Sequence, residues 1–175
     1  MTVTEDGCGL EHAGEYRISL PANRPISSGL TKFYYEISFL ELEGGRPNPE
    51  VAIGFCTISD KSLLEFPGWP KMGAAASKSW AYHGDDGRFY CYLGHNSVHV
   101  GEPYGPGDVI GCGVDFGTGK IWYTRNGTLL AHGFENVFGR LFPVVGLSDK
   151  VKLEANFGID AENKPFLWKA EDGLR

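Results

Sequence analysis

The sequence predicts an all-β protein, and more specifically an antiparallel sandwich of two sheets in one domain with at most one short helix. The 25 glycines and 10 prolines are spread along the 175 residues, which is typical of many short strands separated by turns. Hydrophobic residues make up 42% of the chain, enough for one sizeable core and too few for two. Between the turn signals, apolar residues recur with the period of two that strands require.

The clearest strands lie in residues 107–130, which predict a meander of three strands. Its two turns contain the glycines and the Asn126-Gly127 dipeptide that tight hairpins need. Glycines weaken a strand, so we expect a large neighbour such as Trp122 to pack closely against Gly111 and Gly113. Side chains alternate between the two faces of a strand, and one face of the first strand is apolar and belongs in a core: Ile110, Cys112, Val114 and Phe116.

Seven further strands are expected, each bounded by turn signals. The strand at 33–41 alternates cleanly, so we expect its aromatic side to be buried and the side with Tyr34, Glu36 and Ser38 to face water. The strand at 50–57 is apolar almost throughout, which predicts burial on both faces. The seven strands cover residues 16–20, 33–41, 50–57, 79–83, 88–93, 141–147 and 150–157.

The domain itself is expected to span residues 15–168. Residues 1–14 show no periodicity and are expected to be an irregular lead-in, and residues 169–175 a C-terminal tail. Residues 59–66 form the only helix-like segment, because a serine can cap its start and a Pro-Gly dipeptide ends it. Residues 165–168 are expected to pack back onto the sheets.

The charge and hydropathy of the chain restrict its partners. The formal net charge is −6 and no cluster of Lys or Arg offsets it, so nucleic acid is not expected as a partner, whereas a basic peptide would be attracted. No apolar run approaches the ~20 residues that a membrane span needs, so no membrane partner is expected. The first 14 residues are acidic and lack a secretion signal. We expect an intracellular protein, cytoplasmic or nuclear, and a monomer.

The four cysteines are widely separated and include no C-x-x-C pair. Three of them lie inside apolar strand patterns, where free cysteine behaves as a small hydrophobe. We expect buried, reduced thiols rather than disulfides. The cysteines are Cys8, Cys56, Cys91 and Cys112.

Two motifs could carry chemistry, and both have a simpler interpretation. His83-Gly84-Asp85-Asp86 places an imidazole beside two carboxylates, but zinc and calcium sites need ligands at other spacings, so we expect a hairpin turn with a hydrogen-bonded histidine. Asn126-Gly127-Thr128 matches a glycosylation acceptor and is better explained by the hairpin. The sequence has no nucleophile elbow and no reactive cysteine pattern. We therefore expect no cofactor, no metal and no catalytic residues, that is, not an enzyme.

Six blocks of the sequence, taken in chain order, resemble the SPRY domain family. The resemblance covers residues 16–168 and is strongest to the subgroup represented by Ran-binding protein M and related subunits of large ubiquitin ligases. It implies a twisted two-sheet β-sandwich and a non-catalytic role in which loops at one edge bind a short peptide of another protein. The blocks are Phe66-Pro-Gly-Trp69, Trp80-Ala-Tyr-His-Gly-Asp-Asp-Gly87, Tyr104-Gly-Pro-Gly-Asp-Val-Ile-Gly-Cys112, Trp122-Tyr-Thr-Arg-Asn-Gly127, Leu141-Phe-Pro-Val-Val-Gly-Leu147 and Ala155-Asn-Phe-Gly158.

Stiff loops with aromatic residues indicate where such a peptide would bind. Segments 17–29, 67–72 and 102–106 are too rich in proline and glycine to be strands, adjoin strand ends and are expected to converge at one edge. Aromatic and arginine side chains are the usual energetic anchors of interfaces, and rigid loops lose little entropy on binding. The candidate peptide-binding residues are Arg17, Pro21, Asn23, Arg24, Trp69, Met72, Gly73, Tyr82 and Tyr104.

Alternatives remain for both the site and the function. Trp69 could equally be a lid over the sheet edge, whereas Trp80, Trp122 and Trp168 are expected in the core. The first functional interpretation is an adaptor that binds a short peptide and recruits targets to a ubiquitin-ligase or similar assembly. A carbohydrate-binding sandwich is the alternative, because exposed tryptophans and an Asp-rich turn also occur in lectin loops. A purely scaffolding domain is a third interpretation.

Overall fold

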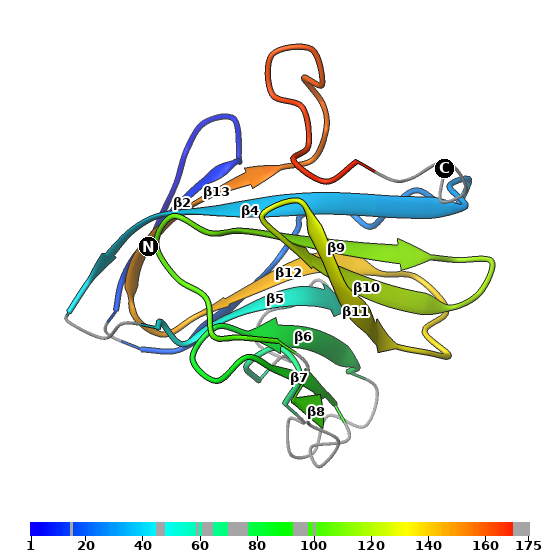
Figure 1. Cartoon of the computed structure of the whole chain (residues 1–175), viewed down its shortest axis with the longest axis horizontal. Coiled ribbons are helices and arrows are strands. Elements are labelled where there is room, and N and C mark those ends of the chain that lie inside the picture. Colours follow the sequence, from blue (N-terminus) through cyan, green and yellow to red (C-terminus); the bar gives the residue numbers. More distant parts are fainter. Residues whose placement is uncertain are drawn as a thin grey trace.

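The computed structural model is a sandwich of two antiparallel sheets packed face to face (Figure 1). It describes residues 1–14, 16–44, 48–58, 60, 65–69, 77–92, 98–99 and 101–169. These residues contain no helix, and so none that could cross a membrane. The predicted all-β sandwich is confirmed, while most of the helix-like segment 59–66 lies outside the described residues.

One sheet has seven strands among the described residues. Every neighbouring pair in it is antiparallel. In spatial order its strands are β1 (Thr2–Val3), β2 (Gly9–Ala13), β13 (Lys150–Asn156), β4 (Lys32–Glu43), β9 (Val109–Asp115), β10 (Lys120–Arg125) and β11 (Thr128–Phe134).

The other sheet has six strands within the same described part of the chain. Its pairs are also antiparallel. In spatial order its strands are β3 (Ile18–Pro21), β12 (Phe142–Leu147), β5 (Val51–Cys56), β6 (Ser79–His83), β7 (Arg88–Cys91) and β8 (Val98–His99).

The core lies between the sheets and is built from the apolar faces that the alternation predicts. Ile110, Cys112 and Val114 of β9 are fully buried. Tyr35 of β4 crosses the core, and its hydroxyl donates a 2.7 Å hydrogen bond to the carbonyl oxygen of Gly54 in β5. A buried hydroxyl needs such a partner, so this bond ties one sheet to the other.

The predicted meander is confirmed as β9, β10 and β11. Asn126 and Gly127, with φ of 50° and 76°, form the tight turn because both positions require the left-handed region. A Cβ atom at Gly113 would overlap the indole ring of Trp122. The missing side chain therefore lets Trp122 lie flat against the sheet, as the sequence predicts.

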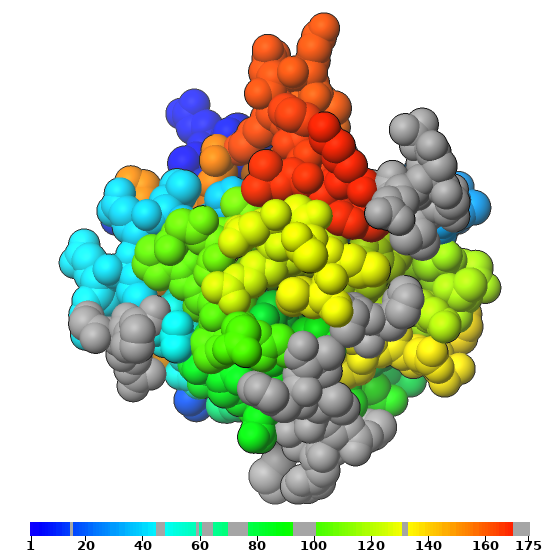
Figure 2. Space-filling view, in the orientation of Figure 1, coloured from blue at the N-terminus to red at the C-terminus, as the bar shows by residue number. Residues whose placement is uncertain are grey.

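The outer face of β4 is covered, so the expectation that it faces water is wrong. Only 3% of the Glu36 surface is exposed, because the C-terminal segment up to Trp168 lies over it. The Glu36 carboxylate accepts hydrogen bonds from the backbone nitrogens of Leu167 and Trp168, both at 3.0 Å. The segment also packs rings against Tyr34, and in Figure 2 its red surface meets the yellow hairpin of β10 and β11. The predicted return of residues 165–168 onto the sheets is confirmed.

The expectation of an irregular lead-in over residues 1–14 is also wrong. β2 pairs with β13 along its length, from Ala13 opposite Lys150 to Gly9 opposite Glu154. The pairing satisfies the backbone edge of β13, which would otherwise be unpaired. Leu10 and His12 alternate toward the protein interior, where Leu10 packs against the core and His12 is buried. Two inward residues are too few to give a periodic signal in the sequence.

The fit of Trp122 against Gly113 gives a stability prediction. Gly113→Ala places a methyl group in the volume of the indole, so Trp122 must move off the sheet. We expect the free energy of unfolding to fall by roughly 2 kcal/mol, as for overpacked cores, measured by denaturant unfolding.

Gly29→Ala is the matched control, because a Cβ at Gly29 meets no atom within 4 Å. Its free energy of unfolding is expected to change by less than about 0.5 kcal/mol. Equal effects of the two substitutions would show that close packing at Gly113 is not what that glycine provides.

Candidate functional site

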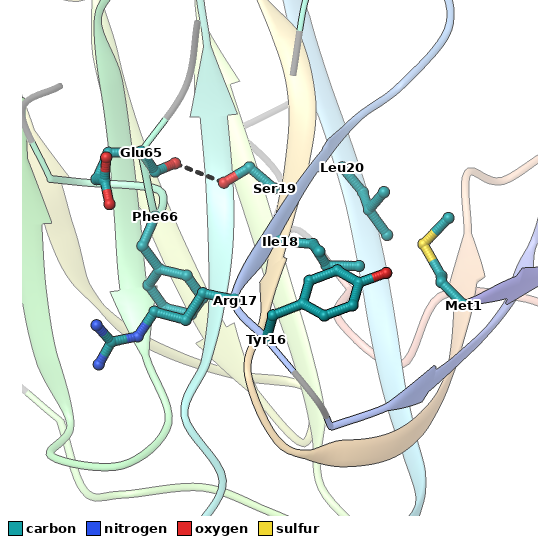
Figure 3. Close-up of a pocket in the computed structure, with 8 residues that line it drawn as sticks. All are labelled: Met1, Tyr16, Arg17, Ile18, Ser19, Leu20, Glu65 and Phe66. Carbon is teal, nitrogen blue, oxygen red and sulfur yellow. Dashed lines mark hydrogen bonds between the residues drawn. The ribbon is translucent and has the colours of Figure 1, made fainter. Parts of the chain in front are cut away.

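A hollow of about 320 Å³ lies beside β3 and is the centre of the candidate site. β3 is the last strand of its sheet and pairs only with β12 among the described residues. Side chains alternate along it, so Arg17 and Ser19 lie on one side and Tyr16, Ile18 and Leu20 on the other (Figure 3). The hollow is lined by Met1, Tyr16, Arg17, Ile18, Ser19, Leu20, Glu65 and Phe66.

Arg17 joins this hollow to the turn that carries Trp69. Its guanidinium lies 4.8 Å from the Trp69 ring centroid and 5.9 Å from that of Phe66, distances at which a cation is attracted to an aromatic face. It also forms an ion pair with the carboxylate of Glu50, which is mostly buried. Half of the Arg17 side chain stays exposed. Arg17 is thus held in place while part of its surface remains open to a ligand.

The turn from Phe66 to Trp69 is fixed by several contacts. The backbone nitrogen of Trp69 donates to the Phe66 carbonyl at 2.9 Å, and the backbone nitrogen of Gly68 donates to the Ser79 hydroxyl at 2.8 Å. Gly68 has a φ of +88° and lies so close to Tyr90 that a Cβ would be 2.6 Å from the Tyr90 Cβ. Only glycine meets both conditions. The partly buried Trp69 is therefore presented from a rigid backbone.

His83 supports this turn from beneath. Its Nε2 lies 2.7 Å from the carbonyl oxygen of Pro67, so this nitrogen must carry the proton and donate. The ring is buried and contacts the rings of Phe66, Trp69 and Tyr90. Burial lowers the pKa of His83 to about 4, against the opposing effect of the Pro67 carbonyl. The hydrogen-bonded histidine predicted at this hairpin is confirmed.

Tyr104 is not an exposed anchor, and this prediction is wrong. None of its surface is exposed, and its ring packs between Phe39 and Tyr82. Its hydroxyl lies 3.0 Å from the Val51 carbonyl oxygen and 2.8 Å from that of Tyr82. Burial raises the Tyr104 pKa well above its ordinary value. Proline and glycine neighbours indicate a loop, but they do not indicate that its tyrosine turns inward.

Tyr82 is buried in the same way, so it cannot border a surface site. None of its surface is exposed, and its hydroxyl donates to the carbonyl oxygen of Glu102 at 2.6 Å. The third predicted segment, 102–106, therefore contributes to the core at these two tyrosines. A Cβ at Gly84 would lie 2.9 Å from the Tyr104 ring, so the Gly84 turn makes room for this packing.

The remaining predicted residues do not gather around Trp69. Pro21 and Asn23 line a second hollow, of about 420 Å³, near the N-terminal strands. Arg24 lines a third, of about 580 Å³. Met72 and Gly73 lie outside the described residues. Of the nine predicted residues, the structure brings Arg17 and Trp69 into contact.

Two residues of the site escaped the sequence reasoning. Phe66 lies under Arg17 and beside Trp69, and Glu50 holds the Arg17 guanidinium. A charged residue at the head of the apolar run 50–57 is a signal that could have pointed to Glu50, because a buried carboxylate needs a cationic or hydrogen-bonding partner.

The part of the chain that the structure describes offers neither a metal-binding cluster nor a reactive thiol. No group of three or more His, Cys, Asp and Glu side chains there could hold a metal ion. Cys56, Cys91 and Cys112 are buried free thiols, and burial raises the pKa of Cys56 to about 12, which disfavours the reactive thiolate.

Comparisons with known proteins match most of the chain to one family. A family profile described as "SPRY domain" matches residues 32–160. Ran-binding protein 9 of Xenopus tropicalis is 35% identical over 162 residues, which cover 90% of this chain and 26% of that protein. Ran-binding protein 9 of Homo sapiens is 34% identical over 162 residues, covering 90% and 20%. The chain thus spans about a quarter or less of the length of these relatives.

Solved structures match over nearly the whole chain. The "Crystal structure of human SPRY domain" is 27% identical, has a TM-score of 0.67, and covers 90% of this chain and 96% of that one.

The burial of His83 predicts a dependence of stability on pH. The folded pKa of about 4 lies below the unfolded value of about 6.5, so the unfolded chain binds more protons between these values. The stabilisation is complete above about pH 6.5 and is lost as the pH falls toward 4. Between about pH 7 and pH 5, we expect the free energy of unfolding to fall by ~2 kcal/mol through this residue.

His83→Gln is the control, since a glutamine amide can still donate to the Pro67 carbonyl but does not titrate. Its unfolding free energy, measured by denaturant titration at both pH values, should depend less on pH by that amount. An unchanged pH dependence would assign the effect to another group.

Proposed function

This chain belongs to the SPRY domain family, and we propose on that basis that it is a non-catalytic domain that binds a short peptide segment of a partner protein. The observation that carries this proposal is the contact of Arg17 with Trp69 beside the hollow at β3. SPRY domains are protein–protein interaction modules, and the relatives are named Ran-binding proteins. We propose that the peptide lies across the Arg17–Trp69 surface, defined by Arg17, Phe66, Trp69 and the hollow.

The arrangement suits an extended peptide because it offers both backbone and side-chain contacts. β3 is the terminal strand of its sheet in the described structure, so its outer edge presents backbone groups to which a peptide can add as a strand. Ile18, Leu20 and Phe66 give the hollow apolar walls for a peptide side chain. The exposed half of Arg17 provides donors for a carbonyl or carboxylate of the peptide.

The rigidity of the site favours binding. Arg17 is restrained by Glu50, and the Phe66–Trp69 turn is restrained by Ser79 and His83. Groups that are already ordered lose little conformational entropy when a ligand binds. For the whole protein, we propose recruitment of targets to a ubiquitin-ligase or similar assembly, in keeping with the subgroup that the sequence resembles.

The site predicts that binding and stability respond to different residues. Trp69→Ala should weaken the affinity for a peptide selected by display on this chain by ~2 kcal/mol or more, about thirtyfold, as for an anchoring residue. Arg17→Ala should weaken it as well, while Lys152→Ala on the exposed face of β13 should not. Isothermal titration of each variant with the same peptide measures the change.

Melting curves separate these effects from unfolding. Tyr104→Ala should destabilise the domain strongly, because it removes a fully buried ring and leaves a cavity. Full affinity in both Trp69→Ala and Arg17→Ala would place the peptide elsewhere. A selection that yields no peptide, together with hits on a glycan array, would favour the carbohydrate-binding alternative.

A further inference from the structure

We propose that the chain has a second docking surface, a basic hollow that binds an acidic segment of a partner protein bearing an aliphatic or aromatic anchor. The basic hollow has a volume of about 580 Å³. It is distinct from the Arg17–Trp69 surface, and the proposal does not depend on that site. Its defining residues are Arg24, Ile26, Ser27, Leu30, Phe116 and Arg140.

The basic hollow has a fixed frame although its walls are loops. The backbone nitrogen of Ile26 donates to the carbonyl oxygen of Leu141 at 2.9 Å, and that of Phe116 donates to Thr31 at 2.9 Å. Ile26 and Leu141 are themselves buried. Three chain segments that are distant in sequence are therefore held side by side, and the hollow between them persists without a ligand.

Its charge is opposite to that of the chain as a whole. Arg24 and Arg140 both line the basic hollow, and no carboxylate of a described residue does. Within the described residues neither arginine forms an ion pair, whereas these seven cations do: Arg17, Arg88, Lys120, Arg125, Lys150, Lys152 and Lys164. In a chain with 22 acidic and 16 basic residues, this hollow thus brings together two arginines that have no carboxylate partner within the described residues.

Exposed apolar side chains accompany the two arginines. Leu30, which lines the basic hollow, is 45% exposed, and Phe138, which neighbours its wall at Gly139, is 57% exposed. The Arg140 guanidinium lies 5.4 Å from the ring centroid of Phe142, so an aromatic ring orients it. Large apolar groups at the surface of a soluble domain favour contact with a partner when they gather beside a concave site.

Together these features fit one kind of ligand. Guanidinium forks bind carboxylates through paired, charge-assisted hydrogen bonds, and the apolar floor accommodates an aliphatic or aromatic anchor. The hydroxyls of Ser27 and Ser28, which also line the hollow, can add hydrogen bonds to the peptide backbone. A concave site suits an inserted side chain better than a flat lipid surface, and two arginines are too few to follow a nucleic-acid backbone.

The basic hollow and the Arg17–Trp69 surface lie toward opposite ends of β12. Arg17 precedes Ile18, which pairs with Leu147 at the end of β12, whereas Arg140 lies just before the beginning of β12 at Phe142. A six-residue strand spans roughly 20 Å. Two segments of one partner can therefore occupy both surfaces at once, which raises affinity through effective concentration.

The test is a peptide selection on a chain whose first surface has been removed. Trp69→Ala is panned against a library in which random positions flank a fixed Phe or Leu. We expect Asp and Glu to be enriched around the anchor relative to the starting library. Binding of an enriched peptide to the wild-type chain should weaken about tenfold or more when Arg24→Glu and Arg140→Glu are combined, and it should weaken with added salt.

The double variant Lys150→Glu and Lys152→Glu is the matched control, because it makes the same change in net charge on the other sheet. It should leave peptide affinity unchanged. Melting curves should show every variant folded at the assay temperature, with a somewhat lower Tm for the lysine variant because it reverses the ion pairs with Glu43 and Glu41. The proposal fails if acidic residues are not enriched, or if the control weakens binding as much as the arginine variant. It also fails if the arginines are needed only for sedimentation with vesicles of anionic phospholipid.

Discussion

The strand β5 is apolar on both faces, and the need to cover its outer face accounts for the candidate site. Every residue of β5 is buried. Val51, Ile53 and Phe55 pack into the core, while Ala52 on the opposite side packs with Phe66, Ala81 and Trp69. The turn from Phe66 to Trp69 is thus first a cover that keeps apolar surface from water. The same turn places two aromatic rings beside the edge strand β3, where Arg17 can reach them.

Local patterns were sufficient to predict most of the fold. The meander of β9 to β11 follows from alternation, from the Asn126-Gly127 turn and from glycines that admit Trp122, all of which act between close neighbours. Predictions failed where the structure of a segment depends on contacts with residues far away in the sequence. β2 forms because β13 has a free edge, and Glu36 is buried because residues from the other end of the chain cover it. No pattern within strand 33–41 indicates that the C-terminal segment covers its outer face.

The candidate site was predicted only in part, for the same reason. Arg17 and Trp69 were correctly placed together, since both flank strand ends and carry the chemistry of interface anchors. Tyr104 shows the same sequence features as Trp69, with proline and glycine neighbours in a long loop, yet it fills the core. Tyr104 differs from Trp69 because the missing side chain of Gly84 leaves room for the Tyr104 ring. Gly84 lies in a hairpin 20 positions before Tyr104, so the local sequence around Tyr104 does not indicate this contact.

Some residues of the candidate site cover the outer face of β5, and others are exposed arginines. This difference limits which residues could change the proposed binding specificity without loss of stability. Phe66 is only 3% exposed, and its substitution would uncover the outer face of β5, so a change in the proposed peptide contact at Phe66 is coupled to lost stability. Arg24 and Arg140 are exposed and cover no apolar face of a strand in this way. Such residues can be exchanged at little cost in folding free energy. Arg24, Arg140 and the loops beside them can therefore change without loss of the fold, while the aromatic turn must keep its shape to cover β5.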